Sequence, residues 1–284
     1  SALLPFITDI YGDNYPADRR GAFFSKPLLL SVGVASLSGF IGSSILERDI
    51  GYYPLIFSFF GFCAFFKALA VYSMPSKPID QSPHESPFGN MKYIWQDRSF
   101  GYVLLTWFIM GFANLWTLPL RVDYVTSPQW GIEGSAVFVA LIITIIPETM
   151  RMLLIPFWAK LFDKMNFVIL RMILNLSFAA GVLLFFISSN PWVIGAGSAL
   201  IGAAFAGGSI AWNLWVTKYA PPGKTGAYMS VHVSLTGIRG TLGPLIGYWA
   251  VGLIGAQNIG ILSCAMMLLA TLMLIPEIKH GRGK

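Results

Sequence analysis

The sequence predicts an all-α polytopic membrane protein, and its composition indicates this class in three ways. Of the 284 residues, 55% are hydrophobic and only 11% are charged, whereas a soluble globular chain averages roughly 25% charged residues. Apolar stretches of the length that crosses a ~30 Å hydrocarbon core as a helix recur along the whole chain. Glycine is abundant, with 29 residues, which suits helices that pack at small-residue contacts. The apolar runs are continuous rather than alternating, which disfavours a transmembrane barrel.

Eight full spans are expected, preceded by the end of another helix over residues 1–11. They are placed at roughly 22–45, 53–73, 100–121, 134–158, 166–188, 191–215, 226–254 and 257–276, each near the length that a bilayer demands. Residues 74–99 begin with the Pro- and Ser-rich stretch MPSKPIDQSPHESPFGN, which predicts a flexible connector. Pro147 and Pro156 are expected to bend or loosen the span at 134–158.

The distribution of basic residues predicts the orientation of these spans. Most of the 19 Lys and Arg residues fall in alternate connections and in the C-terminal tail, whereas the opposite connections hold Arg48 and Arg121 only. The positive-inside rule places the basic connections and the C-terminus in the cytoplasm. We therefore expect a multi-pass protein of the plasma (inner) membrane. These loops explain the net charge of +6, so no nucleic-acid partner is expected.

One short turn occurs twice in the chain. YPADRRGAFFS starts at Tyr15 and APPGKTGAYMS starts at Ala220, and the two align at an offset of 205 positions. The alignment pairs Gly21 with Gly226 and continues without a gap over residues 16–42. A chance likeness between two apolar helices is the alternative. The turn matches as well as the helix, so the sequence favours an internal repeat.

The spans at 22–45 and 226–254 are six apart and enter the membrane from the same side, so the repeats are parallel. Two parallel six-helix halves are the arrangement of the major facilitator superfamily, which the chain resembles over essentially its whole length. The resemblance implies that residues 1–73 hold the end of the fourth helix and the fifth and sixth helices of the N-terminal half. It implies that residues 74–99 are the cytoplasmic linker between the halves and that residues 100–284 are the C-terminal six-helix half.

The same resemblance implies three more helices and most of a fourth before Ser1. The first half is then incomplete, and we expect the chain to be an N-terminally truncated fragment. A genuinely shortened protein is the alternative.

A second motif points to the same family. The stretch WAKLFDKMNFVILR is similar to the family's loop between helices 8 and 9, whose pattern is Gly-x-Leu-Ala-Asp-Arg-x-Gly-Arg-Arg. Leu161, Asp163 and Lys164 match its core, while the final basic pair is reduced to Arg171. In the family this Asp caps the N-terminus of a neighbouring helix and steadies one access state, so Asp163, Lys164 and Gly226 are expected to form a gating motif. An ordinary juxtamembrane charged turn is the alternative.

Charged side chains at membrane depth cost about 2.5–3.5 kcal/mol on insertion scales, so each one needs a reason. Glu148 and Arg151 fall in the middle of the span at 134–158, three positions apart, where they can pair on one helix face. Arg239 falls near the centre of the span at 226–254. Substrate sites of this fold lie near the midplane, so we expect Arg151 and Arg239 to face the cavity and Glu148 to be an ion-pair partner or a proton carrier. An ion pair that merely locks the helices is the alternative.

Two pairs of polar and aromatic residues lie in other spans. Asn114 and Trp116 fall in the span at 100–121, and Trp212 and Asn213 fall in the span at 191–215. In the resembled family these two helices line the cavity, so the four side chains are expected along the substrate and ion pathway. An amide beside an aromatic ring suits sugars, aromatic acids or drugs alike. Packing or interfacial anchoring is the alternative for the Trp residues.

An enzyme is not expected. The sequence contains no HExxH, GxSxG, CxxC or Walker motif, and its three histidines, at positions 84, 232 and 280, are too scattered for a usual metal site. We therefore expect no cofactor and no metal.

The predicted function is secondary active transport of a small solute across the lipid bilayer by alternating access. Proton symport is the preferred form, because Glu148 is the one acid deep in a predicted span, and uniport is left open. With two arginines beside this acid, a small organic anion is the expected cargo. The alternative function is a non-transporting membrane scaffold or assembly factor that keeps the fold. Water access to the buried charges would discriminate the two.

Overall fold

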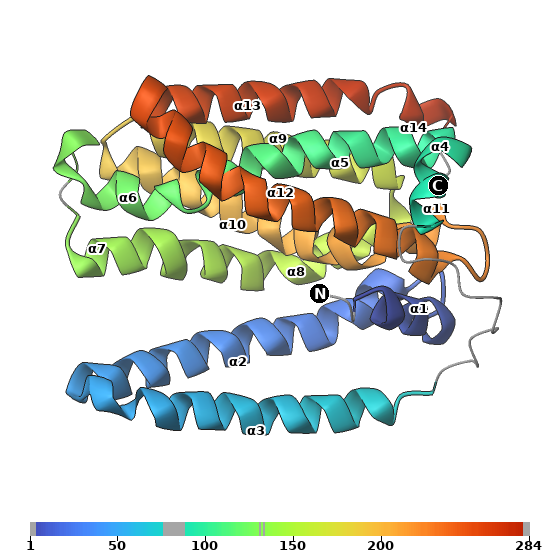
Figure 1. The fold of residues 1–284 in the computed structure, drawn as a ribbon, viewed down its shortest axis with the longest axis horizontal. Coiled ribbons are helices and arrows are strands. Elements are labelled where there is room, and N and C mark those ends of the chain that lie inside the picture. Colours follow the sequence, from blue (N-terminus) through green and yellow to red (C-terminus); the bar gives the residue numbers. More distant parts are fainter. Residues whose placement is uncertain (1–3, 76–88, 131, 133, 281–284) are drawn as a thin grey trace.

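The computed structural model describes residues 4–75, 89–130, 132 and 134–280, and every regular element in these ranges is a helix (Figure 1). The α-helices are α1 (Leu4–Asn14), α2 (Arg20–Arg48), α3 (Tyr53–Tyr72), α4 (Tyr93–Gln96), α5 (Arg98–Thr117), α6 (Leu120–Thr126), α7 (Ala136–Ala140), α8 (Ile146–Lys164), α9 (Phe167–Ile187), α10 (Pro191–Leu214), α11 (Val216–Tyr219), α12 (Thr225–Ile254), α13 (Ala256–Met273) and α14 (Glu277–His280). The predicted all-α class is confirmed. Most of the predicted connector, residues 76–88, lies outside the described residues.

Seven helical segments of the described chain are long and apolar enough to cross a membrane, and they confirm seven of the predicted spans. They are Arg20–Ser38, Tyr53–Tyr72, Arg98–Thr126, Val137–Lys164, Phe167–Ile187, Pro191–Leu214 and Ala256–Met273. The remaining predicted span, at 226–254, is α12, which has 30 residues but is not among the seven. Glycine, serine, threonine and one arginine dilute its apolar side chains and lower its mean hydropathy.

The long helices run side by side, and α5, α8, α9, α10, α12 and α13 form a compact bundle (Figure 1). A second group begins the chain: α2 packs along α8, and α1 packs against α12. The outer helix α3 lies beside α2 in Figure 1 and has no buried residue, as expected of a helix that faces lipid or further helices.

The helix starts support the internal repeat. α2 begins at Arg20 and α12 begins at Thr225, which is the same separation of 205 positions that aligns the two turns. The two longest helices of the described chain therefore begin at equivalent positions of the repeat.

Polar side chains at the starts of several helices accept the N–H groups that have no partner in the first turn. Asp97 accepts from the backbone N–H of Phe100 at the start of α5, and Asn166 accepts from that of Val168 at the start of α9. Asn190 does the same at α10 with a distance of 2.9 Å. Each such cap contributes about 1 kcal/mol.

The region before α8 departs from α-helical geometry, as Pro147 predicts, whereas α8 continues as an α-helix through Pro156. Residues Leu141–Ile145 form a π-helix directly before Pro147. Proline has no N–H and crowds the preceding turn, so a carbonyl there loses its usual partner. Ser198 of α10 donates a hydrogen bond of 2.6 Å to the carbonyl of Ile142 within this segment. The loosened stretch therefore lies one turn before Glu148.

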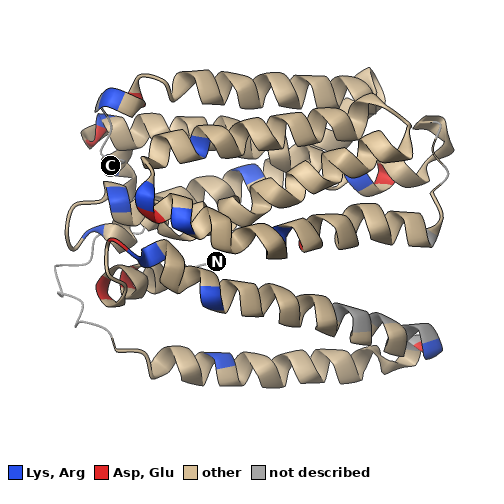
Figure 2. Ribbon diagram, turned by 180° about the vertical axis from the view of Figure 1, so that it is seen from behind, with Lys and Arg blue, Asp and Glu red and all other residues tan. Residues whose placement is uncertain are grey.

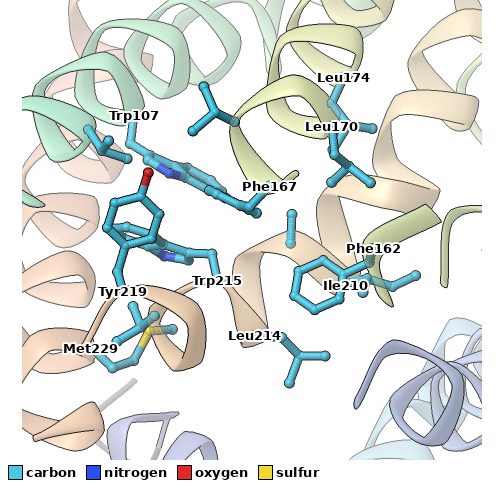
Figure 3. Packing of buried hydrophobic residues seen from close by; sticks show 14 of the residues in the cluster. Trp107, Phe162, Phe167, Leu170, Leu174, Ile210, Leu214, Trp215, Tyr219 and Met229 are labelled. Atoms are coloured by element: carbon cyan, nitrogen blue, oxygen red, sulfur yellow. The ribbon is translucent and has the colours of Figure 1, made fainter. Parts of the chain in front are cut away.

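A cluster of large aromatic residues fills the core where α5, α8, α9, α10 and α11 come together. Figure 3 shows Trp107, Phe167 and Trp215 within it, surrounded by branched aliphatic side chains. Trp215 is fully buried, with its ring centroid 5.6 Å from that of Phe100 and 5.7 Å from that of Trp107. Lipid tails are as apolar as these side chains, so the cluster is stabilised by close packing and ring geometry more than by exclusion of water.

Charged residues are concentrated at one end of the bundle, with fewer at the other end (Figure 2). We call the crowded end the basic end; it contains the turns at 15–20 and 163–166 and the helix α11, which meet at one pocket. This segregation is the one that the sequence predicts for alternate connections.

Candidate functional site

The predicted pair on α8 is formed. Arg151 Nη1 lies 3.3 Å from Glu148 Oε1, and Arg151 Nη2 donates a hydrogen bond of 3.0 Å to Ser209 Oγ on α10. The Arg151 side chain is 25% exposed and the Glu148 side chain 36%. The partners are three positions apart, so one helix face presents both charges. Ser209 had no signal in the sequence beyond being a hydroxyl in an apolar run.

One face of α10 connects this pair to the other predicted residues. Ser209, Trp212 and Asn213 are spaced three and four apart, which places them on the same side of the helix. The amide of Asn213 donates a hydrogen bond of 2.8 Å to the Ser209 carbonyl. The Trp212 ring lies 5.7 Å from the guanidinium carbon of Arg239 on α12. Thus α10 contacts both predicted arginines.

Arg239 is far more enclosed than Arg151, with an exposed fraction of 4%. Its guanidinium donates to the Trp107 carbonyl on α5 and, at 2.9 Å, to Thr236 Oγ1. Gly111 makes room for it, because a Cβ at that position would overlap the guanidinium. In the part of the chain that the structure describes, Arg239 has hydrogen-bond acceptors but no carboxylate partner.

A second buried cation lies next to Arg239 and was misjudged from the sequence. Arg171, counted there with the basic loop, lies in the second turn of α9 and is 2% exposed. Its guanidinium carbon sits 3.5 Å from the centroid of the Trp107 ring, and Nη2 is 3.0 Å from Met110 Sδ. Only its position in the sequence could have indicated this burial, because Arg171 is the fifth residue of the apolar stretch that begins at Phe167.

Further polar atoms are enclosed in the same region. His232 packs with its ring centroid 4.2 Å from that of Trp212 and 4.9 Å from that of Trp107. Among the described residues, its Nε2 and the Nε of Arg239 are buried without a hydrogen-bond partner. Buried polar atoms without partners are costly, so this cluster is an unusual feature of the core.

The predicted residues on α5 are both engaged with the protein. Asn114 Oδ1 accepts a hydrogen bond of 2.9 Å from Arg121 Nη2, one helix further on. Trp116 is 5% exposed, and its indole N–H donates to Ser263 Oγ on α13. Neither side chain contacts the Glu148–Arg151 pair through a hydrogen bond in the described structure.

The predicted gating residue Asp163 caps a helix of the other group. Its Oδ1 accepts from the backbone N–H of Gly21 at 2.6 Å, and its Oδ2 accepts from that of Ala22 at 2.9 Å. A carboxylate at a helix N-terminus also interacts favourably with the helix dipole. A Cβ at Gly21 would lie 2.6 Å from the Ala159 carbonyl oxygen, so this approach of α8 to α2 requires glycine. Lys164 beside it is exposed.

The equivalent turn of the repeat has the same arrangement with a different acid. The backbone N–H of Gly226, at the start of α12, donates a hydrogen bond of 2.7 Å to Asp9 Oδ1 on α1. A Cβ on Gly226 would overlap that carboxylate. The paired glycines of the two turns thus each place a helix N-terminus on an aspartate from another helix. The sequence analysis did not single out Asp9, which had no motif around it.

The described residues hold no group of three or more His, Cys, Asp or Glu side chains that could bind a metal ion. The two cysteines do not pair: Cys63 is exposed on α3 and Cys264 is buried on α13.

Taken together, the fold and these residues define a polytopic helical membrane protein with charged side chains within its spans and helix N-termini capped across its basic end. Its family is more specific. The profile of the Major Facilitator Superfamily matches residues 1–244 and, in a second match, residues 133–284. The chain therefore belongs to the major facilitator superfamily, whose members carry out secondary transmembrane transport and are not enzymes. A comparison with curated proteins found no match.

Proposed function

We propose that the protein moves a small solute by alternating access, with the Glu148–Arg151 pair at the centre of the substrate and ion pathway. The observation that carries this proposal is the state of the pair: it lies within a span, is bonded to α10 through Ser209, and is only partly buried. Two charges held at membrane depth carry a desolvation cost. A role in binding a solute explains why such a pair is present, whereas helix packing alone does not require charged residues.

A small organic anion with protons is the cargo that this chemistry favours. An incoming carboxylate competes with Glu148 for the planar guanidinium of Arg151, which suits two-pronged carboxylate binding. Glu148 then loses its ion-pair partner, and in this proposal it serves as the proton carrier. Anion and proton load together and leave together, because releasing either one restores the competition between Glu148 and the anion.

The remaining predicted residues lie on α5, α10 and α12, and Trp212 and Asn213 share the α10 face that carries Ser209. Arg239 is a second cation, with its guanidinium carbon 5.7 Å from the centroid of the Trp212 ring. Asn114 and Trp116 stabilise α5 through Arg121 and Ser263 and so shape the pathway wall.

We further propose that the gating residues hold one access state. In this arrangement residues 1–73 belong to one half and residues 100–284 to the other, joined by the linker at 74–99. Asp163 with Gly21, and Asp9 with Gly226, are then bonds between the halves at the basic end. Opening that end breaks both caps. With the basic end and the C-terminus in the cytoplasm of a plasma (inner) membrane, the described conformation is closed toward the cytoplasm.

Cysteine accessibility tests the site directly. In a background with Cys63 and Cys264 replaced, single variants Glu148→Cys, Arg151→Cys and Arg239→Cys are treated with a small water-soluble thiol reagent from each side of the membrane. We expect positions 148 and 151 to react, and position 239 to react less, because of its 4% exposure. Ile155→Cys, one turn further along α8 and fully buried, is the unreactive control.

If all three positions resist the reagent from both sides, the transport site proposed here is wrong, and the non-transporting scaffold becomes the better account of the same fold. Reaction at 148 and 151 that is blocked by small carboxylates would support both the site and the class of cargo.

A further inference from the structure

A pocket of about 460 Å³ lies at the basic end, apart from the Glu148–Arg151 pair. It opens where the start of α2, the turn between α8 and α9, and α11 meet. The polar and charged residues of its lining are Arg20, Asp163, Lys164, Asn166, Thr217 and Lys218. These come from the first group of helices and from the bundle, so the pocket exists only when the two groups of helices are together.

The charges of the lining do not balance. Three cationic side chains face one carboxylate. That carboxylate is already engaged, because both oxygens of Asp163 accept backbone N–H groups of α2. Within the lining, the positive charges therefore outnumber the negative ones, and Asp13, which does not line the pocket, offsets part of the charge of Arg20.

Two of the cations are held in place by main-chain acceptors. Arg20 donates to the carbonyls of Gly12 at 2.8 Å and Tyr15 at 3.2 Å, and Lys218 Nζ donates to the carbonyl of Phe162 at 2.8 Å. Both side chains are thereby positioned before any ligand arrives, which lowers the entropy that binding would cost.

The surroundings of Lys218 fit an anion in the same place. Burial lowers the pKa of the Lys218 ammonium; Asp163 opposes the shift, and Arg20 adds to it. An anion beside the ammonium would reverse the effects of burial and of Arg20, so binding would stabilise the charged form.

We propose that this pocket binds a phosphate group through Arg20, Lys164 and Lys218. A phosphate offers several acceptor oxygens and up to two negative charges, which matches one guanidinium and two ammonium groups converging on one space. The pocket lies where candidate spans end, at Lys164 and at Arg20. An anionic phospholipid headgroup reaches that level, and free phosphate supplies the same chemistry from solution.

The consequence concerns regulation, and this part rests on the proposed function. A phosphate that bridges Arg20 of α2 to Lys164 and Lys218 binds the state in which Asp163 caps α2 and is released when that contact opens. By linkage, it shifts the population toward the closed basic end.

Two probes distinguish the sources. Inorganic phosphate is titrated into the purified full-length protein in detergent, and heat of binding is measured. Separately, the thermal unfolding midpoint is compared in nanodiscs of phosphatidylcholine alone and of phosphatidylcholine with phosphatidylglycerol. Binding of free phosphate assigns the site to a soluble anion, whereas a rise in midpoint with phosphatidylglycerol alone assigns it to a lipid headgroup; either supports the proposal.

Matched variants show whether this pocket is the site at which phosphate or phosphatidylglycerol binds. Lys164→Gln is expected to weaken whichever interaction is seen about fivefold, the effect of removing ~1 kcal/mol for one basic residue. Lys160→Gln removes the same charge from an exposed position one turn earlier on α8 that does not line the pocket, and is expected to change nothing. Lys164 is exposed, so its loss leaves folding intact.

The proposal is overturned if neither probe binds, or if Lys160→Gln weakens binding as much as Lys164→Gln. Binding is read here without transport, so a failure at this pocket is distinct from a failure of the cysteine test at positions 148 and 151.

Discussion

Arginines within the spans differ in what compensates their charge. Arg151 has a carboxylate at 3.3 Å, whereas Arg171 and Arg239 have a tryptophan face, a sulfur atom, a hydroxyl and a main-chain carbonyl among the described residues. A guanidinium over an aromatic ring gains roughly 2 kcal/mol when desolvated. Of these three arginines, Arg151 is the one paired with an acid, and under the proposed function it is the one whose partner an anionic cargo would replace.

Substituting Glu148→Gln tests the coupling role of that acid. The variant keeps the shape and removes the charge, so Arg151 can still bind an anion while no proton loads at position 148. In proteoliposomes, carboxylate uptake driven by a pH gradient is expected to fall at least about tenfold, with carboxylate exchange retained. Thr149→Ala, exposed on the neighbouring face, should leave both unchanged. Gradient-driven uptake of normal rate in Glu148→Gln would rule out this acid as the proton carrier.

The glycine of the second turn gives a prediction of stability. In Gly226→Ala the added Cβ would overlap the Asp9 carboxylate, so we expect the unfolding free energy to drop by about 1–3 kcal/mol. Gly237→Ala is the matched control, since nothing lies within 4 Å of a Cβ there and alanine favours a helix by up to ~1 kcal/mol. Thermal unfolding in detergent compares them. Equal midpoints for the two variants would contradict the close approach of α1 to α12.

Whole helices are linked by their ends. α2 and α12 lack a side-chain cap of their own and instead receive a carboxylate from α8 and from α1. A second contact of this kind is at the π-helix before α8, where Ser198 of α10 donates a hydrogen bond to the carbonyl of Ile142. Substitutions at the capped helix starts or at the π-helix are therefore expected to alter the packing between helices rather than the helices themselves.

For the first of these contacts, Asp163→Asn is the informative change. The amide retains one acceptor oxygen but loses the charge at the N-terminus of α2, so a loss of about 1 kcal/mol of stability is expected. Asp18→Asn removes the same charge from the exposed turn just before α2, where the side chain caps nothing among the described contacts. A thermal unfolding midpoint that falls for Asp163→Asn but not for Asp18→Asn supports the cap; the reverse order contradicts it.

Seen as a whole, the molecule separates charge along its long axis (Figure 2). In the proposed topology the crowded end faces the cytoplasm, because moving loops rich in Lys and Arg across a membrane is unfavourable. The same end holds the two caps and the pocket proposed to bind phosphate, so the proposed gating and regulation would share this location.

Orientation is testable in membrane vesicles of known sidedness. In the background without Cys63 and Cys264, Lys164→Cys at the basic end should react with an impermeant thiol reagent in inside-out vesicles. Gln129→Cys, exposed beyond α6, should react in right-side-out vesicles. The opposite pattern would invert the proposed topology.

The sequence predicted features that depend on residues close together in the chain, and it missed features that depend on residues far apart. Spans follow from local apolarity, and the Glu148–Arg151 pair follows from spacing on one helix, so both were predictable. Arg171 was not, because whether a basic residue near a span end points to water or over the ring of Trp107 depends on a different helix. Asp9 was missed for the same reason: its partner, Gly226, lies more than two hundred positions away.

By itself the sequence determined the all-helical membrane class, the repeat of 205 positions and the segregation of charge, because hydropathy, helix period and loop composition act over a few turns of chain. Only the tertiary structure decided which acid caps which helix, that Arg239 is enclosed while Arg151 is partly open, and that three cations share one pocket. These depend on how helices distant in sequence approach one another, and small residues and close packing set that approach.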